Sequence, residues 1–164
     1  MRTKIFALLL FILFCCTSNK NFDLQNKSIG ETQRDYQLLI KDVILKMVKN
    51  KEVSAIELQN IIPRTEDEFI EYYSYTNMDK TKEFRKAFYE VDSIIAERAE
   101  NNHNNFLKLF LEIAPFADGE YAETYFDKVE SVIQKNKVVF CKMFNSLNPK
   151  SKKRLEKYYK QYCN

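Results

Sequence analysis

Apolar residues recur at intervals of three and four through most of the chain after residue 32. This spacing places them along one face of an α-helix, whereas a strand would need strict alternation. The pattern breaks at the Asn-rich run 101–105 and near each of the three prolines. Eight segments carry it, and their apolar residues fall within 36–48, 56–61, 69–73, 84–95, 106–113, 121–133, 138–147 and 155–162.

Capping residues stand just before several of these segments. Ser54 could cap the second segment, and residues 65–68, Thr-Glu-Asp-Glu, have the spacing of a capping box before the third. Pro149 is expected to end the seventh helix, and Ser151 to cap the last. The predicted fold is therefore all-α, with seven or eight helices in stacked antiparallel αα-hairpins that form a bundle or a short repeat-like array.

The three prolines stand in similar surroundings, which raises the question of an internal repeat. Apolar residues precede each proline, and a tyrosine follows ten residues later, at Tyr73, Tyr125 and Tyr159. Residues 88–95, FYEVDSII, also read much like residues 126–133, FDKVESVI. A helical hairpin repeated three times would explain this. Chance likeness between amphipathic helices explains it equally well, so both interpretations stay open.

Composition agrees with a globular helical domain. Charged residues make up 30% of the chain and hydrophobic residues 45%, unlike a disordered segment. The chain has only 2 Gly and 3 Pro, too few for the hairpins of a many-stranded β fold or for a Gly-rich nucleotide loop. Residues 32–164 have the length of one ordinary domain.

The first sixteen residues differ from the rest of the chain. Arg2 and Lys4 precede an uninterrupted run of ten apolar residues, 5–14. A bilayer core needs about 20 helical residues to span it, so this run is too short. A basic start, a short apolar stretch and small residues after it are typical of a secretory signal peptide.

The end of this run, Leu13-Phe14-Cys15-Cys16, resembles the lipobox of bacterial lipoprotein precursors. The lipobox has a leucine three places before the acceptor cysteine and a small residue directly before it, and Cys16 is the cysteine that fits. The resemblance covers residues 1–16 only. It implies a signal peptide at 1–15, lipid attachment at Cys16, and membrane anchoring through that lipid. The polar, aperiodic residues 16–31 are interpreted as a flexible tether.

The implied location is the bacterial cell envelope, with the domain facing the periplasm or displayed at the surface. Two alternatives remain open. The leader could be an ordinary signal peptide, whose removal would discard both cysteines and release a secreted protein. It could also stay attached as an anchor or as part of the folded core.

Charge is unevenly distributed. The net charge of +3 falls to +1 without Arg2 and Lys4, so overall charge indicates no class of partner. Residues 118–130 carry a local charge of −4, and residues 135–160 carry +8. The basic segment, with its tyrosines, is the candidate surface for a partner, although a solvated helix face would look the same. The candidate residues are Lys150, Lys152, Lys153, Arg154, Lys157, Tyr158, Lys160 and Tyr162.

The sequence shows little catalytic chemistry. There is one histidine, His103, and no Gly-x-Ser-x-Gly motif, so a serine or cysteine hydrolase has no evident base or oxyanion loop. Neither a metal nor another cofactor is expected, and an exported protein has little occasion to meet nucleic acid. The favoured function is non-enzymatic binding or scaffolding of an envelope protein, with the oligomeric state undetermined.

Two further functions are kept as alternatives. An envelope hydrolase with a carboxylate-based site between helices would require a deep polar pocket with at least two buried acidic groups. A secreted carrier of an apolar ligand would require an internal apolar cavity.

Cys141 and Cys163 could pair in an oxidising compartment. A simple hairpin about Pro149 places Cys141 opposite residue 158, and Cys163 then lies several Å too far along the axis. A disulfide needs Cα atoms within about 7 Å. The pairing is therefore left open.

Overall fold

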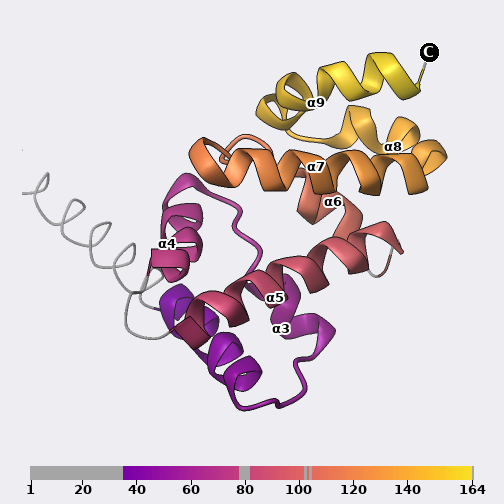
Figure 1. Ribbon diagram of the computed structural model, residues 1–164. Helices are drawn as coiled ribbons and strands as arrows, with labels where there is room; N and C mark the ends of the chain where they lie inside the picture. Colours follow the sequence, from indigo (N-terminus) through magenta and orange to yellow (C-terminus); the bar gives the residue numbers. More distant parts are fainter. Residues whose placement is uncertain (1–34, 78–81, 102, 104, 164) are drawn as a thin grey trace, which may run out of the picture. The chain divides into compact units, whose positions relative to one another are not determined.

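The protein was analysed as a computed structural model, which describes residues 35–77, 82–101, 103 and 105–163 (Figure 1). Within these ranges the chain forms helices and turns but no strand, which confirms the predicted all-α class. The signal peptide, Cys16 and the tether to residue 31 lie outside the described residues. Residues 37–163 belong to one compact unit.

The helices correspond closely to the apolar segments of the sequence. The first covers residues 35–48. The predicted segment 138–147 is divided, because its helix gives way to a 3₁₀ turn, η1 (Phe144–Ser146). The other helices are α3 (Ala55–Asn60), α4 (Glu66–Asn77), α5 (Lys82–Glu100), α6 (Phe106–Leu111), α7 (Gly119–Lys135), α8 (Lys137–Met143) and α9 (Pro149–Tyr162). Among the described residues, no helix combines the length and apolar composition needed to cross a bilayer.

Local side-chain caps explain where α3 and α4 begin. Ser54 Oγ accepts a hydrogen bond from the Glu57 amide at 3.3 Å, and the Glu57 carboxylate accepts one from the Ser54 amide at 2.9 Å. Lys46 also donates to the Glu57 carboxylate, and these bonds lower the pKa of Glu57 to about 2. Thr65 Oγ1 accepts from the Glu68 amide at 3.2 Å. The Ser54 cap is confirmed as a full capping box, whereas at Thr65 only half of the box forms, since the Glu68 carboxylate accepts from the Arg64 amide at 2.6 Å.

The predicted start of α9 is wrong by three residues. Asn148, rather than Ser151, is the N-cap, and its Oδ1 accepts from the Ser151 amide at 2.8 Å. Pro149 is the first residue of α9. A proline fits this position because the first amides of a helix have no intrahelical partner and the ring presets a helical φ. Pro149 therefore opens α9 and does not end the helix before it.

Helix α5 lies at the centre of the fold and packs against α4, α6 and α7. Contacts near residue 92 of α5 involve residues 121 and 128 of α7, and contacts near residue 100 involve residues 131 and 135. The residue numbers of the contact partners increase in the same direction along both helices, so α5 and α7 run parallel. The short α6 returns between them, as the antiparallel hairpin pattern requires (Figure 1). The buried residues of α5 are Ala87, Phe88, Val91, Asp92, Ile95, Ala96 and Ala99.

The proposed three-fold repeat stays a prediction. Pro63 and Pro115 precede α4 and α7 by a few residues, whereas Pro149 is itself the first residue of α9. The third unit therefore departs from the other two. The two similar octapeptides also differ in burial, since Phe88 is fully buried and its counterpart Phe126 is half-buried.

A disulfide joins Cys141 of α8 to Cys163, with a Cα–Cα distance of 5.5 Å. The expectation that Cys163 lies too far along the axis was wrong because α8 and α9 do not form a simple hairpin. The link between them contains η1 and then Leu147 and Asn148 in extended conformation, with ψ of 154° and 155°. This longer link lets the end of α9 reach Cys141.

Candidate functional site

Two adjoining hollows lie where α4, the segment 115–118 and the start of α9 meet. Their volumes are about 500 Å³ and about 590 Å³. We call them together the α4–α9 groove. Both are lined by Glu66, Pro115, Phe116 and Lys150. The remaining lining residues are Phe69, Ile70, Tyr73, Ser74 and Asp118 in the first, and Arg64, Thr65, Asn148 and Pro149 in the second.

One face of α4 forms the floor and one wall of this groove. Glu66, Phe69, Ile70 and Tyr73 follow the spacing i, i+3, i+4, i+7, which aligns them on one side of a helix. The opposite side of α4 carries the buried Tyr75. The sequence pattern of α4 therefore divides its apolar residues between the core and the groove.

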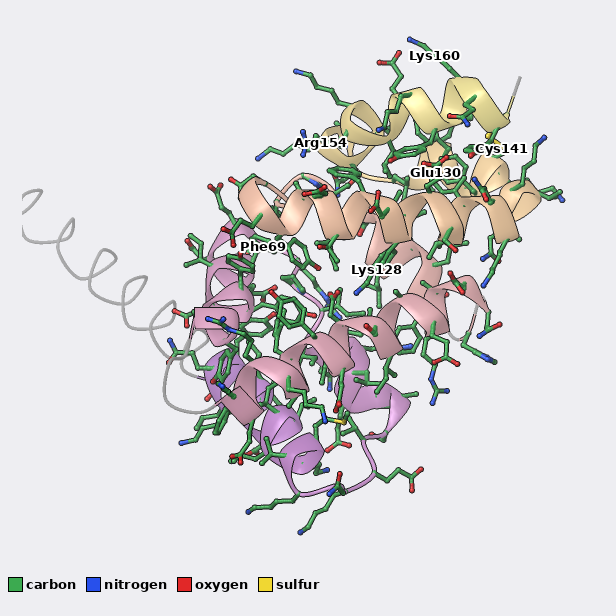
Figure 2. All side chains as sticks on the ribbon, viewed as in Figure 1. Phe69, Lys128, Glu130, Cys141, Arg154 and Lys160 are labelled. Atoms are coloured by element: carbon green, nitrogen blue, oxygen red, sulfur yellow. A yellow bond between two sulfur atoms is a disulfide. The ribbon has the colours of Figure 1, made fainter. Side chains whose placement is uncertain are left out.

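The floor is an aromatic cluster that is fixed by packing. Phe69 is buried, and its ring centroid lies 6.0 Å from that of Tyr73 and 6.0 Å from that of Phe116, with both pairs stacked (Figure 2). The Tyr121 ring meets Phe69 edge-on at 5.5 Å and Tyr73 at 5.6 Å. Such ring pairs add to the stability gained by burial alone. The floor is thus already formed before anything binds.

The rim of the groove is open and electrically balanced. Ile70, beside the aromatic floor, is 59% exposed. Two acidic residues, Glu66 and Asp118, and two basic residues, Arg64 and Lys150, line the rim, and all four are exposed. The groove therefore offers an accessible apolar surface without a net charge.

Arg154 holds two walls of the groove together. Its Nε donates to the Ala114 carbonyl at 3.2 Å and its Nη2 to the Ala117 carbonyl at 2.7 Å. The guanidinium also lies 4.9 Å from the centre of the Phe126 ring. Arg154 was predicted as a partner-binding residue; it is exposed, and two of its donors bind backbone oxygens of the fold.

The two predicted surface tyrosines of α9 also hold the fold together. Tyr158 is 3% exposed and its hydroxyl donates to the Phe126 carbonyl at 3.3 Å, so its placement on an accessible surface is wrong. The buried face of α9 runs through Leu155 and Tyr158, at a spacing of three. Tyr162 is half-buried, and its hydroxyl donates to Glu130 at 3.0 Å and accepts from Gln134 at 2.9 Å.

The lysines of α9 remain at the surface. Lys150, Lys153, Lys157 and Lys160 are exposed, and Lys152 is half-buried with its Nζ 3.4 Å from the Asn145 carbonyl. The predicted basic surface therefore keeps its lysines and the exposed Arg154, whereas Tyr158 is buried and Tyr162 half-buried.

Asp92 forms a buried polar cluster that the sequence analysis missed. It is 1% exposed. Its Oδ1 accepts from Tyr121 at 2.8 Å and from Tyr72 at 3.3 Å, and its Oδ2 accepts from Lys128 at 2.5 Å. Burial and the nearby Asp92 charge raise the pKa of Tyr121 well above its ordinary value. A carboxylate inside the apolar stripe Phe88, Val91, Ile95 was the signal that could have revealed it.

A second polar contact joins the same two helices further along. The Glu100 carboxylate accepts hydrogen bonds from Lys135 and from Ser131, the latter at 2.6 Å, and these bonds lower the pKa of Glu100. The Asn136 side chain donates to the carbonyls of Ala99 and Glu100. Figure 2 shows Lys128 on the side of α7 that faces α5, and Glu130 on the side toward α9. These groups connect helices within the fold.

The hydrolase alternative gains no support from this geometry. It requires two buried acidic groups facing a cleft. In the described part of the chain, Asp92 is the one buried carboxylate, and Lys128 and two tyrosines occupy its oxygens. The same residues contain no group of three or more His, Cys, Asp and Glu side chains that could hold a metal ion. His103 is exposed in the loop between α5 and α6.

Comparison with known proteins found no matching family, no similar curated protein and no similar solved structure. The proposals below therefore rest on the residues and geometry of this chain.

Proposed function

We propose that this protein is a lipid-anchored, non-enzymatic binding domain of a bacterial cell envelope. Its partner is another envelope protein, which places an extended segment with an aromatic or proline side chain in the α4–α9 groove. The observation that carries this proposal is the exposed Ile70 beside the prebuilt floor of Phe69, Tyr73 and Phe116.

The shape of the groove favours a protein segment over a small molecule. Sites for small molecules bury about 70–90% of the ligand surface. Here the rim residues Arg64, Glu66, Ile70 and Lys150 are all exposed, so a small ligand would stay largely in water. Extended segments commonly dock on aromatic-lined grooves of this kind. The rim has as many acidic as basic side chains, so apolar burial rather than charge is expected to drive binding.

Crosslinking in the producing cell tests where the partner lies. A photo-crosslinking amino acid is placed at position 70, and at position 56 as a matched control. Ile56 is a good control because it is 70% exposed and lies on α3, away from the groove lining. We expect a discrete adduct from position 70 and none from position 56. Absence of an adduct at 70, or equal adducts at both positions, contradicts the proposal.

Affinity measurements then test the groove directly. The crosslinked segment, identified by mass spectrometry, is synthesised as a fluorescent peptide. Burying an isoleucine side chain contributes about 1.5–3 kcal/mol. We therefore expect Ile70→Asp to weaken peptide binding by at least about tenfold, and Ile56→Asp to leave it unchanged. Equal affinities for the two variants would show that the segment binds elsewhere.

Two observations support the exported, anchored part of the proposal. One is the lipobox-like sequence before Cys16. The other is the Cys141–Cys163 disulfide, since disulfides persist mainly in oxidising, extracytoplasmic compartments. Mass spectrometry of the mature N-terminus after metabolic lipid labelling is the test, with Cys16→Ala as the unlabelled control. A mature protein that begins after residue 16 and carries no lipid would exclude the anchor.

A further inference from the structure

Four lysines form a straight row on the outer face of α9. Lys150, Lys153, Lys157 and Lys160 are separated by three, four and three residues, so they share one side of the helix. The row is about 15 Å long, at 1.5 Å per residue. The buried residues of α9 lie on the opposite side and are Ser151, Leu155 and Tyr158. We call these four residues the lysine row.

The charge of the lysine row is not neutralised by the acidic helix α7. Within the described residues, Lys150, Lys153 and Lys157 form no ion pair, although Lys157 Nζ lies 4.5 Å from the centre of the Tyr158 ring. Lys160 pairs with Glu156 of its own helix at 2.7 Å, and both side chains are exposed. Exposed pairs of this kind stabilise little and can exchange partners. Figure 2 shows Lys160 pointing away from the neighbouring helices.

Lys150 also lies on the rim of the α4–α9 groove, but the side chains around Lys153, Lys157 and Lys160 do not resemble a specific protein interface. Protein interfaces are depleted in lysine and depend on a few buried aromatic, Arg or large apolar anchors. The exposed large apolar residues of the described chain all lie outside α9. Lysine ammonium groups are strongly hydrated point charges on flexible stems, without the fixed geometry of a guanidinium. Such a row is suited to bind a surface whose negative charge is spread out and not fixed in position.

We infer that the lysine row lies against the anionic headgroups of a phospholipid bilayer. This inference rests on the proposed function, since a lipid at Cys16 would keep the domain close to a membrane, where weak contacts gain a high effective concentration. Each lysine near an anionic bilayer contributes about 1 kcal/mol, or about fivefold in binding. Four lysines without an apolar anchor would hold α9 at the headgroups without inserting it.

Lysine footprinting on vesicles tests this inference with the full mature protein. The protein is mixed with an excess of vesicles made of phosphatidylcholine alone or of phosphatidylcholine and phosphatidylglycerol in equal parts. Trace acetylation followed by mass spectrometry gives the reaction rate of each lysine. We expect the four lysines of the row to react several-fold more slowly on the anionic vesicles only. About 1 M salt should restore the rates, because the screening length then falls to about 3 Å.

Two double variants that remove the same amount of positive charge distinguish binding through the lysine row from a general attraction of the protein to anionic vesicles. Lys153→Gln with Lys157→Gln should restore the rates of Lys150 and Lys160. Lys41→Gln with Lys49→Gln, at exposed positions elsewhere, should leave the row protected. Equal rates on both vesicle types would overturn the inference. So would equal protection of Lys41 and Lys49 in the wild type, or stronger protection of the row by a soluble polyanion such as heparin.

Binding to the neutral vesicles tests the lipid anchor independently of the lysine row, because these vesicles carry no net charge that attracts lysines. A protein that binds neutral vesicles but shows no protection on anionic ones retains the lipid anchor and contradicts the lysine row. A protein that does not bind neutral vesicles, yet is protected on anionic ones, supports the lysine row and contradicts the anchor.

Discussion

Asp92→Ala is expected to lower the free energy of unfolding by about 3–5 kcal/mol, the range for removing one partner of a buried ion pair. The carboxylate is 1% exposed and accepts from Lys128, Tyr121 and Tyr72. Its removal leaves the hydroxyl of Tyr121 and the ammonium of Lys128 without their acceptor. Equilibrium urea unfolding, followed by circular dichroism, measures the change.

Matched variants show whether the effect comes from the buried pair. Asp127→Ala removes an exposed aspartate of α7 and should change the unfolding free energy by less than about 0.5 kcal/mol. Lys128→Met leaves Asp92 charged and buried, so it should cost a similar amount to Asp92→Ala. The double variant Asp92→Leu, Lys128→Met should recover part of the loss. If Asp92→Ala is as mild as Asp127→Ala, the carboxylate is not paired as described.

Reduction of the Cys141–Cys163 disulfide is expected to lower the free energy of unfolding by about 3 kcal/mol. The bond closes a loop with a sequence separation of 22, and the chain-entropy relation gives a value of this size. Urea unfolding with and without a reductant provides the measurement. Cys163→Ser should reproduce the effect of the reductant and abolish any further response to it.

Two outcomes would count against the disulfide. The first is an unfolding midpoint that the reductant leaves unchanged. The second is a pair of free thiols at Cys141 and Cys163 in protein isolated from the producing cell, which would also weigh against export. Thiol alkylation before and after reduction, read by mass spectrometry, distinguishes free from bonded cysteines.

The positions of the helices were predictable because the residues that determine them, the apolar spacing and the caps, lie within or next to each helical segment. The three-and-four spacing identified the helices, and Ser54 and Thr65 identified two of their starts through contacts three residues away. Asn148 also caps through a contact three residues on, but the sequence does not reveal it because the following Pro149 is equally typical of a helix end. Proline stops a helix only from its interior and is favoured at the first position.

Tertiary features were less predictable because they depend on segments far apart. The α4–α9 groove combines residues near 66, 116 and 150, and no local pattern relates them. The burial of Tyr158 depends on how α9 is rotated against α7, which the contact with the Phe126 carbonyl settles. Asp92 is the exception, since an acidic residue in an apolar stripe is visible in the sequence and needs a partner when buried.

The two polar contacts between α5 and α7 have a consequence for how these helices can move. Asp92 meets Lys128, and eight residues later Glu100 meets Lys135, seven residues further along α7. A slip of α7 along α5 by one turn, about 5.4 Å, would separate both pairs at once and strand the Asp92 charge in an apolar environment. The two contacts therefore favour one register of the two helices, and we expect any opening of the molecule to come from tilting or detachment at its ends and not from sliding at its centre.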